Sequence, residues 1–143
     1  SSTAPNPSVK HERSLSPALL NLRRDIFQRG EMRNISFILT TGQIRNRTKT
    51  VTRRLGWKNL KVGERLQGCV KCQGRKPGEP LQKLAVVEVV SIRAEKLWDI
   101  TTEDCEREGF PGMDPHEFVE MFCDSMGCRP DVMVSRIEFK YVD

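Results

Sequence analysis

The sequence predicts an α+β fold, a small mixed β-barrel with helices inserted before its last strand. Three observations lead to this prediction. Residues 84–92 are rich in valine and isoleucine, which favour strands. Residues 134–141 alternate residue types with a period of two, as expected of a final strand. Between these runs, residues 100–109 and 113–127 carry helix start and stop signals.

Length and charge limit the classes of protein that fit. The chain has 143 residues, which suits one domain. It carries 24 lysines and arginines against 19 acidic residues, a net charge of +5, so we expect a phosphate-bearing or nucleic-acid partner. No apolar run approaches the roughly 18 residues of a membrane span, and no secretion signal is visible. We therefore expect a soluble, cytoplasmic protein without a membrane partner, and the oligomeric state stays open.

The chain divides into three expected parts. Residues 1–13 are polar and contain prolines, which predicts a disordered tail. Residues 14–31 predict an appended amphipathic helix, because Ser16 and Pro17 can begin a helix and Gly30 can end it. Residues 32–143 are expected to form the folded domain.

The elements of that domain follow from short-range patterns. Before the long helices we expect strands at 35–39, 65–72 and 84–92, one turn of helix at 43–47 and an extended segment at 48–54. The run 84–92 is too apolar for an edge strand. Acids in the first turn begin the helix that ends at Gly109. Asp114 and Pro115 begin the next helix, Gly127 ends it, and a strand over 132–142 completes the domain.

A basic segment is the strongest candidate for function. Between residues 45 and 61 the sequence holds seven lysines and arginines, no acid, and Trp57, which could stack on a base. If residues 48–54 are extended, Thr48, Thr50 and Thr52 share one face and Lys49, Val51 and Arg53 the other. The alternative is a solvated basic face without a ligand. The residues predicted to bind nucleic acid are Arg45, Arg47, Lys49, Thr50, Arg53, Arg54, Trp57 and Lys58.

The cysteines and histidines do not predict a cofactor or a metal. Five cysteines, an odd number, fit reduced thiols better than a disulfide framework. A four-thiolate zinc site would combine the pair at 69 and 72 with the pair at 123 and 128. We disfavour that site because residues three apart on a strand face opposite ways. His11 and His116 have no ligand spacing.

The ordered set of motifs resembles the ASCH domain, a relative of the PUA barrel. The resemblance rests on the lysine–threonine motif at 49–54 after a short helix, the turn at 61–64, the valine-rich strand, the helix at 97–109 and the strand at 137–140. The resemblance covers residues 35–142. The chain is also similar to the small ASCH proteins of bacteria and their phages. The resemblance implies a PUA-like barrel that binds RNA or nucleotides in a cleft lined by the motif.

One bacterial group within this family is an N4-acetylcytidine amidohydrolase. The resemblance implies that Lys49 would be the proton acceptor, Thr52 the nucleophile and Glu108 the proton donor, with Arg54 where that group also has an arginine. A threonine hydroxyl needs a nearby base, and burial or neighbouring cations can lower the pKa of a lysine enough to supply one. The sequence departs from the group at Arg53, where the group has an apolar residue, and in a longer loop and a larger second helix. A different or bigger substrate is therefore expected.

Three hypotheses follow for this chain. The leading one is an RNA- or nucleotide-binding domain whose basic cleft, built by residues 45–57, is closed by the helix of Glu108 and could process a modified base. The second is a metal-free amidohydrolase of acylated cytidine-type nucleosides. The third is a protein-interaction module of phage or host that uses residues 14–30 and 118–122. The first two hypotheses both require the side chains of Lys49 and Glu108 to lie close together. The alternative for each residue is a simpler role. Lys49 contacts phosphate, Thr52 is an ordinary strand residue, and Glu108 pairs with Arg107 or Arg54.

Overall fold

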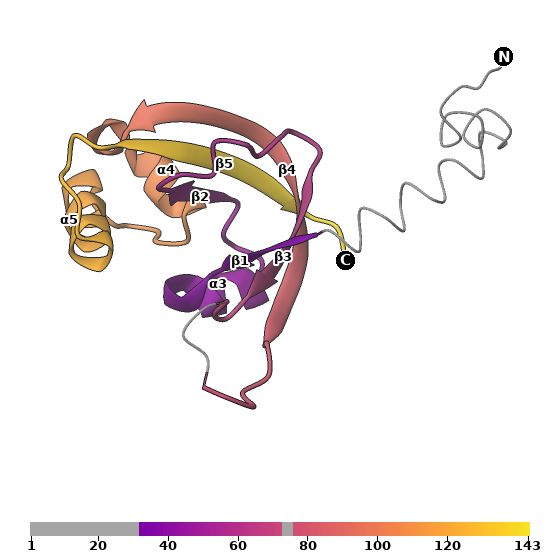
Figure 1. Cartoon of the computed structure of the whole chain (residues 1–143). Coiled ribbons are helices and arrows are strands. Elements are labelled where there is room, and N and C mark those ends of the chain that lie inside the picture. The colour runs from indigo at the N-terminus through magenta and orange to yellow at the C-terminus, as the bar shows by residue number, and fades with distance from the viewer. Residues whose placement is uncertain (1–31, 73–75) are drawn as a thin grey trace, which may run out of the picture. The chain divides into compact units, whose positions relative to one another are not determined.

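A curled five-stranded mixed sheet is the frame of the domain (Figure 1). The computed structural model describes residues 32–72 and 76–143, so the expected tail at 1–13 and helix at 14–31 lie outside the described residues. The strand order is β1-β3-β4-β5-β2. The sheet forms a half-barrel with a few helices, which confirms the α+β class. The strands are β1 Arg33–Ser36, β2 Val51–Arg54, β3 Arg65–Cys69, β4 Lys83–Lys96 and β5 Met133–Tyr141.

β4 is the centre of the sheet, as its apolar sequence predicts. It pairs antiparallel with β3 through its first part and with β5 along most of its length. Only β1 and β3 are parallel. The strand continues to Lys96, beyond the expected end at residue 92, because its polar second half pairs with the start of β5. Register shifts at Gly68/Cys69 and Val89/Ser91 are irregularities of the kind that bend a sheet.

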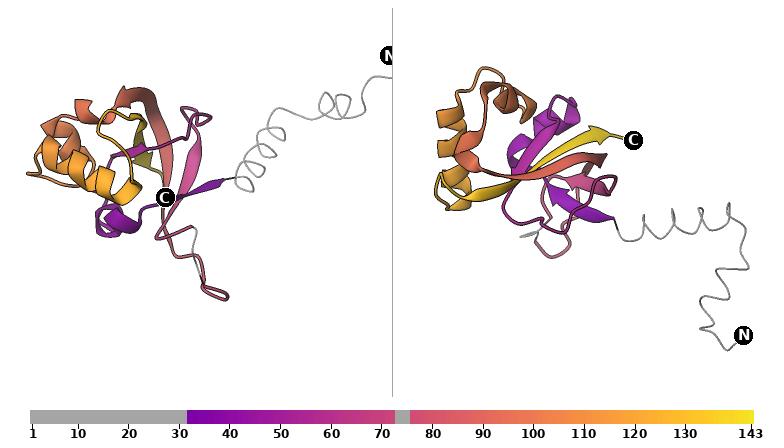
Figure 2. Two further views of the ribbon diagram at one scale, coloured as in Figure 1. Left: turned by 60° about the vertical axis from the view of Figure 1, so that its left-hand side comes forward. Right: turned by 90° about the horizontal axis from the view of Figure 1, so that it is seen from above.

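The helices are η1 Ile38–Thr40, α3 Thr41–Arg45, η2 Leu97–Asp99, α4 Thr102–Arg107 and α5 Pro115–Met126. α5 contacts both η2 and α4 at one end of the sheet, whereas α3 packs against β4 (Figure 2). α5 begins as predicted, with Asp114 as N-cap and Pro115 in the first turn, and Gly127 ends it at φ 64°. α4 is shorter than the helix at 97–109 that the family resemblance implies, because residues 97–99 form a separate 3-10 turn and Ile100 is extended. No helix in the described part of the chain is long and apolar enough to cross a membrane.

Two expectations about the N-terminal half of the domain are wrong. The strand expected at 35–39 ends at Ser36, where the chain turns into η1. The extended segment begins only at Val51, because Thr48 bonds back to Gln43 and Thr50 donates its N–H to the carbonyl of Arg107. The expected threonine face is therefore not formed, because Thr48 and Thr50 precede the strand, whereas Lys49 and Arg53 of the expected cation face do meet at Glu108.

The buried apolar side chains form two clusters. The larger lies between the sheet and α3 and includes Phe37, Ile44 and Val87. The second joins η2, α4 and α5 to the start of β5 and includes Leu97 and Phe118. β2 and α4 contact each other where these two clusters meet. The residues with candidate functional chemistry lie at that junction.

Candidate functional site

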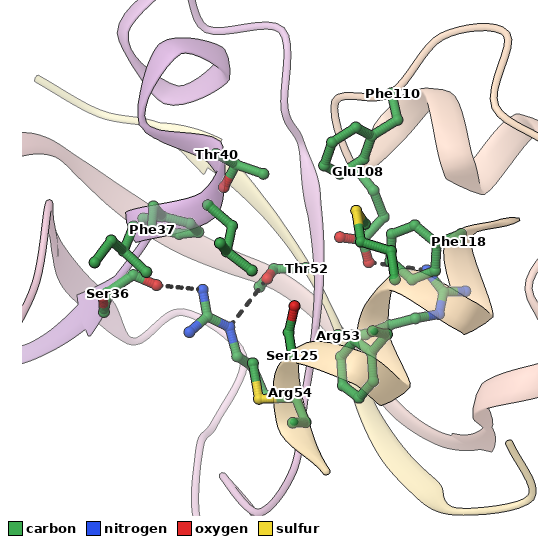
Figure 3. Close-up of a pocket in the computed structure, with 15 residues that line it drawn as sticks. Ser36, Phe37, Thr40, Thr52, Arg53, Arg54, Glu108, Phe110, Phe118 and Ser125 are labelled. Atoms are coloured by element: carbon green, nitrogen blue, oxygen red, sulfur yellow. Dashed lines mark hydrogen bonds and ion pairs between the residues drawn. The ribbon is translucent and has the colours of Figure 1, made fainter. Parts of the chain in front are cut away.

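A pocket of about 210 Å³ opens between η1, β2 and α5 (Figure 3). Segments far apart in the sequence build it, because η1 and β2 lie in the first half of the domain and α5 precedes the last strand. The lining residues are Ser36, Phe37, Ile38, Leu39, Thr40, Thr52, Arg53, Arg54, Glu108, Phe110, Phe118, Met121, Phe122, Ser125 and Met126.

One wall of the pocket is apolar and largely aromatic. Phe118 and Phe122 of α5 are 2% and 7% exposed, and Phe110 packs edge-on against Phe118 at a centroid distance of 6.0 Å. These rings belong to the second apolar cluster and also line the pocket, so they are both core and pocket wall. Ile38 and Leu39 remain 57% and 58% exposed at the rim.

The facing wall is polar and comes from β2. Arg54 Nε donates to Thr52 Oγ1 at 3.1 Å, and Arg54 Nη2 donates to the carbonyl of Ser36 at 2.6 Å (Figure 3). The guanidinium also stands 5.0 Å from the centre of the Phe37 ring. Burial lowers the pKa of Arg54 to about 10, which leaves it charged at neutral pH. Thr52 therefore lines the pocket, and its hydroxyl oxygen accepts a hydrogen bond from the charged Arg54.

Lys49 and Glu108 form a buried pair beside the pocket. Lys49 Nζ donates to Glu108 Oε1 at 2.7 Å and to the Glu108 carbonyl at 2.8 Å, and both side chains are 3% exposed. Glu108 is the C-cap of α4, and Tyr141 Oη donates to the Lys49 carbonyl at 2.6 Å. Burial lowers the pKa of Lys49, although Glu108 acts in the opposite direction. The two residues that had to meet are thus in direct contact.

Arg53 connects this pair to a second set of buried charges. Its Nη1 donates to Glu108 Oε2 at 3.1 Å, and its Nη2 donates to Glu95 and Asp104 at 2.6 Å each. Arg136 of β5 holds Asp104 through bonds of 2.6 and 2.9 Å. The hydrogen bonds from Arg136, followed by those from Arg53, hold the pKa of Asp104 well below its usual range.

Sequence reasoning missed three members of this cluster. Glu95, Asp104 and Arg136 were not predicted as site residues. Asp104 sits in the expected first turn of a helix, where an acid is ordinary, and Arg136 sits in an alternating strand whose other face holds Ile137 and Phe139. Only the buried position of Arg136, at 5% exposed, distinguishes it. Glu108 pairs with Lys49 and Arg53 rather than with Arg107, which pairs with Asp104.

The remaining predicted nucleic-acid residues do not line the pocket. Arg45, Arg47 and Lys58 are exposed, and Arg47 pairs with Asp143 at 3.0 Å. Trp57 is half-buried against the larger cluster, with the Arg33 guanidinium 5.1 Å from its ring centre. Thr50 is half-buried between β2 and α4. Of the basic segment, Thr52, Arg53 and Arg54 line the pocket.

In the described part of the chain, no two cysteines are joined in a disulfide. Cys69 and Cys105 are fully buried, whereas Cys72, Cys123 and Cys128 are half-buried. Among the described residues, no group of three or more histidine, cysteine or acidic side chains could hold a metal ion. Cys123 and Cys128 are neighbours, with their sulfurs 3.9 Å apart.

Comparison with known proteins identifies related folds. No protein-family model matches the chain, and no curated protein matches it. A protein from Enterococcus faecalis V583, of family DUF984, superposes with a TM-score of 0.56 at 12% identity over 85% of this chain and 90% of that one. Hypothetical protein PH0355 superposes with a TM-score of 0.52 at 18% identity over 78% and 97%. An ASCH domain from Lactobacillus crispatus JV V101 has a TM-score of 0.49 at 16% identity over 77% and 79%.

The first two of these similarities show a shared fold and nothing about activity, because both identities are far below 25%. Any inference about activity must therefore come from the pocket and its polar wall.

Proposed function

We propose that this domain of ASCH/PUA-like fold binds RNA or a nucleotide by taking a single base into the pocket. The observation that carries the proposal is one pocket in which phenylalanine rings face Thr52, Arg54 and Glu108. Proteins recognise unpaired bases in the same way, with aromatic side chains against the base face and polar groups at its edge. The pocket thus combines both kinds of contact.

The size of the pocket favours a single ring system. Its volume of about 210 Å³ is below the roughly 300–1,000 Å³ of pockets that enclose drug-sized ligands. A base would fill it, and the sugar and phosphate would remain outside. Exposed cations such as Arg45 and Lys58 then serve as candidates for phosphate contacts, which position a nucleic acid without reading its sequence.

The polar wall offers a defined hydrogen-bonding pattern. Lys49 and Arg53 each donate to one carboxylate oxygen of Glu108, and each oxygen keeps a lone pair that can accept from an amino group. Arg54 is a donor, and the Thr52 hydroxyl can donate or accept. A base with an amino group next to a carbonyl or ring nitrogen matches these groups.

Binding of nucleosides, nucleoside monophosphates and short single-stranded RNA tests the proposal directly, by calorimetry on the full chain. Thr52→Val removes the pocket hydroxyl and keeps a strand-forming shape. We expect it to weaken nucleoside binding roughly tenfold, since a lost hydrogen bond costs about 1 kcal/mol or more. Thr48→Val, on an exposed threonine outside the pocket, is the matched control and should bind as wild type does. Equal affinities for both variants, or no binding by wild type, would overturn the proposal.

A second candidate function is hydrolysis of an acylated cytidine-type nucleoside. The observation that favours it is the 2.7 Å bond between Lys49 Nζ and Glu108 Oε1. Moving one proton along that bond leaves a neutral amine and a carboxylic acid, the base and the acid that such a reaction needs. Burial lowers the pKa of Lys49, which favours the neutral amine.

The reaction would then proceed in two steps. Thr52 Oγ attacks the acyl carbon, its proton passes to Lys49, and Glu108 gives a proton to the departing amine. Water next cleaves the Thr52 ester and releases the carboxylic acid. Arg54, which already bonds Thr52 Oγ1, is placed to stabilise negative charge on the substrate oxygen.

Incubation with N4-acetylcytidine tests this candidate, with cytidine measured by chromatography. We expect release by wild type, loss in Lys49→Met and Thr52→Val, and partial retention in Thr52→Ser, which keeps a hydroxyl. Unchanged turnover in Lys49→Met would rule out the mechanism. Nucleoside binding without release in wild type would leave the binding proposal in place and remove the enzymatic one.

A further inference from the structure

The C-terminal end of α5 is a Schellman motif that contains two cysteines. Gly127 adopts the left-handed conformation, and the N–H of Cys128 donates to the carbonyl of Cys123 at 3.4 Å. In this motif the residue after the glycine contacts the residue four positions before the glycine, and the pair is usually apolar. Here Cys123 and Cys128 occupy those two positions. The backbone itself therefore directs the two thiols toward each other.

The side chains of Cys123 and Cys128 are in contact, as the motif predicts. The two sulfurs lie 3.9 Å apart, and both side chains are half-buried against the second apolar cluster. A disulfide needs about 2.05 Å, so the sulfurs would have to approach by about 1.9 Å, the difference between the two distances. We expect rotation about the two Cα–Cβ bonds to provide this shift with α5 and its cap in place.

We propose that Cys123 and Cys128 are a redox-modification site that forms a reversible disulfide by exchange with a small-molecule disulfide. The thiolate of Cys128 attacks one sulfur of the oxidant and releases the other as a thiol, which leaves a mixed disulfide on Cys128. The thiolate of Cys123 then attacks the Cys128 sulfur and releases the second thiol. Two protein thiols are oxidised and one small disulfide is reduced to two thiols.

The other cysteines are placed differently. Cys69 and Cys105 have no exposed surface, which excludes a bulky oxidant. Cys72 is half-buried and serves as the accessible control. Burial raises the pKa of the Cys123 thiol, which disfavours Cys123 as the first attacking thiolate.

The site adjoins the pocket through α5. Phe122, Ser125 and Met126, from the last turns of this helix, line the pocket next to the cysteine pair. A disulfide across the cap would fix that turn, so oxidation should change affinity for a base. The change in affinity for a base rests on the proposed function, whereas formation of the disulfide does not.

The test uses the full chain in glutathione buffers of increasing oxidised fraction, followed by alkylation and peptide mass mapping. In wild type and in Cys72→Ser we expect the 123 and 128 peptides to become linked with loss of two hydrogens, and reductant to reverse the link. In Cys123→Ser, a glutathione adduct should accumulate on Cys128. If both thiols stay open to alkylation in the most oxidising buffer, the proposal is overturned. A link that joins Cys72 instead would overturn it as well.

A ligand measurement separates this proposal from the proposed function. We expect the nucleoside dissociation constant to differ several-fold between the oxidised and reduced forms of wild type and not to change in Cys128→Ser. If the disulfide forms and affinity is the same in both forms, the connection to the pocket is overturned and the redox site stands. If neither form binds a nucleoside while the peptides become linked, the proposed function fails and the redox site stands.

Discussion

The cations of the basic segment fall into two regions with different environments. Arg45, Arg47 and Lys58 are exposed, whereas Lys49 and Arg53 are buried at 3% exposure each. The sequence gives no sign of this division, because the cations are closely spaced and no acid lies among them. What separates them is contact with the acids at positions 95, 104 and 108. Lys49 and Arg53 are therefore buried because acids from distant segments compensate their charges.

The two regions should also differ in energy. An exposed pair such as Arg47 with Asp143 contributes about 0–1 kcal/mol, because water screens it. Removing one member of a buried, hydrogen-bonded set costs about 3–5 kcal/mol, because the remaining charge has no compensation. Substitutions that appear equivalent in the sequence are therefore expected to give different outcomes.

The largest expected effect is at Asp104. Asp104→Asn keeps the shape of the side chain and removes the charge that Arg53 and Arg136 share. We expect the free energy of unfolding to fall by about 3–5 kcal/mol, measured by chemical denaturation. Asp143→Asn, at the exposed pair, is the matched control and should cost less than about 1 kcal/mol. Equal effects of the two substitutions would contradict the division into two regions.

A smaller effect is expected at Gly109, which follows Glu108. Its φ is +103°, and an added Cβ would lie 2.7 Å from Gln43 Cγ. Gly109→Ala should therefore destabilise the protein by about 2–4 kcal/mol, from backbone strain together with the close contact. Gly112→Ala separates the two causes. Gly112 also has a positive φ, 83°, but nothing lies within 4 Å of its Cβ position, so we expect about 1 kcal/mol. If both variants unfold alike, the contact with Gln43 contributes nothing.

A region can be predicted from the sequence when the residues that determine it are close together in the chain. The caps of α5 and the apolar run of β4 are local, so both elements were predicted close to their observed bounds. The alternation at 48–54 failed before Val51 because Thr48 bonds back to Gln43 and the N–H of Thr50 bonds to α4, although the Thr50 carbonyl still accepts from Phe139 of β5. The contact of Lys49 with Glu108 spans 59 positions and came only from a family resemblance. The buried state of Arg53 depends on three acids at least 42 positions away, which no local pattern reveals.

We expect a fall in pH to reduce the stability of the protein mainly through the buried region. Arg136 and Arg53 lower the folded-state pKa of Asp104, and Arg53 lowers that of Glu95 despite partial burial. Groups with lowered pKa contribute full stability above their unfolded values, about 4, and lose it as pH falls further. Wild type should therefore lose stability steeply below about pH 4, and Asp104→Asn should lose it less steeply. Denaturation midpoints between pH 2 and 6 measure this, and parallel curves would contradict the assignment.

The smallest effect on stability is expected at the exposed cations, where the effect on binding should be larger. Arg45→Ala should leave the free energy of unfolding within about 0.5 kcal/mol of wild type, because Arg45 is exposed at the end of α3. If Arg45 contacts a phosphate, the variant should bind single-stranded RNA more weakly, and the salt dependence of log K should become shallower by about 1. Binding of an uncharged nucleoside should not change, because that ligand occupies only the pocket. A salt dependence equal to wild type would exclude Arg45 from the RNA surface, and a weakened nucleoside affinity would mean that the exposed and buried regions are not separable.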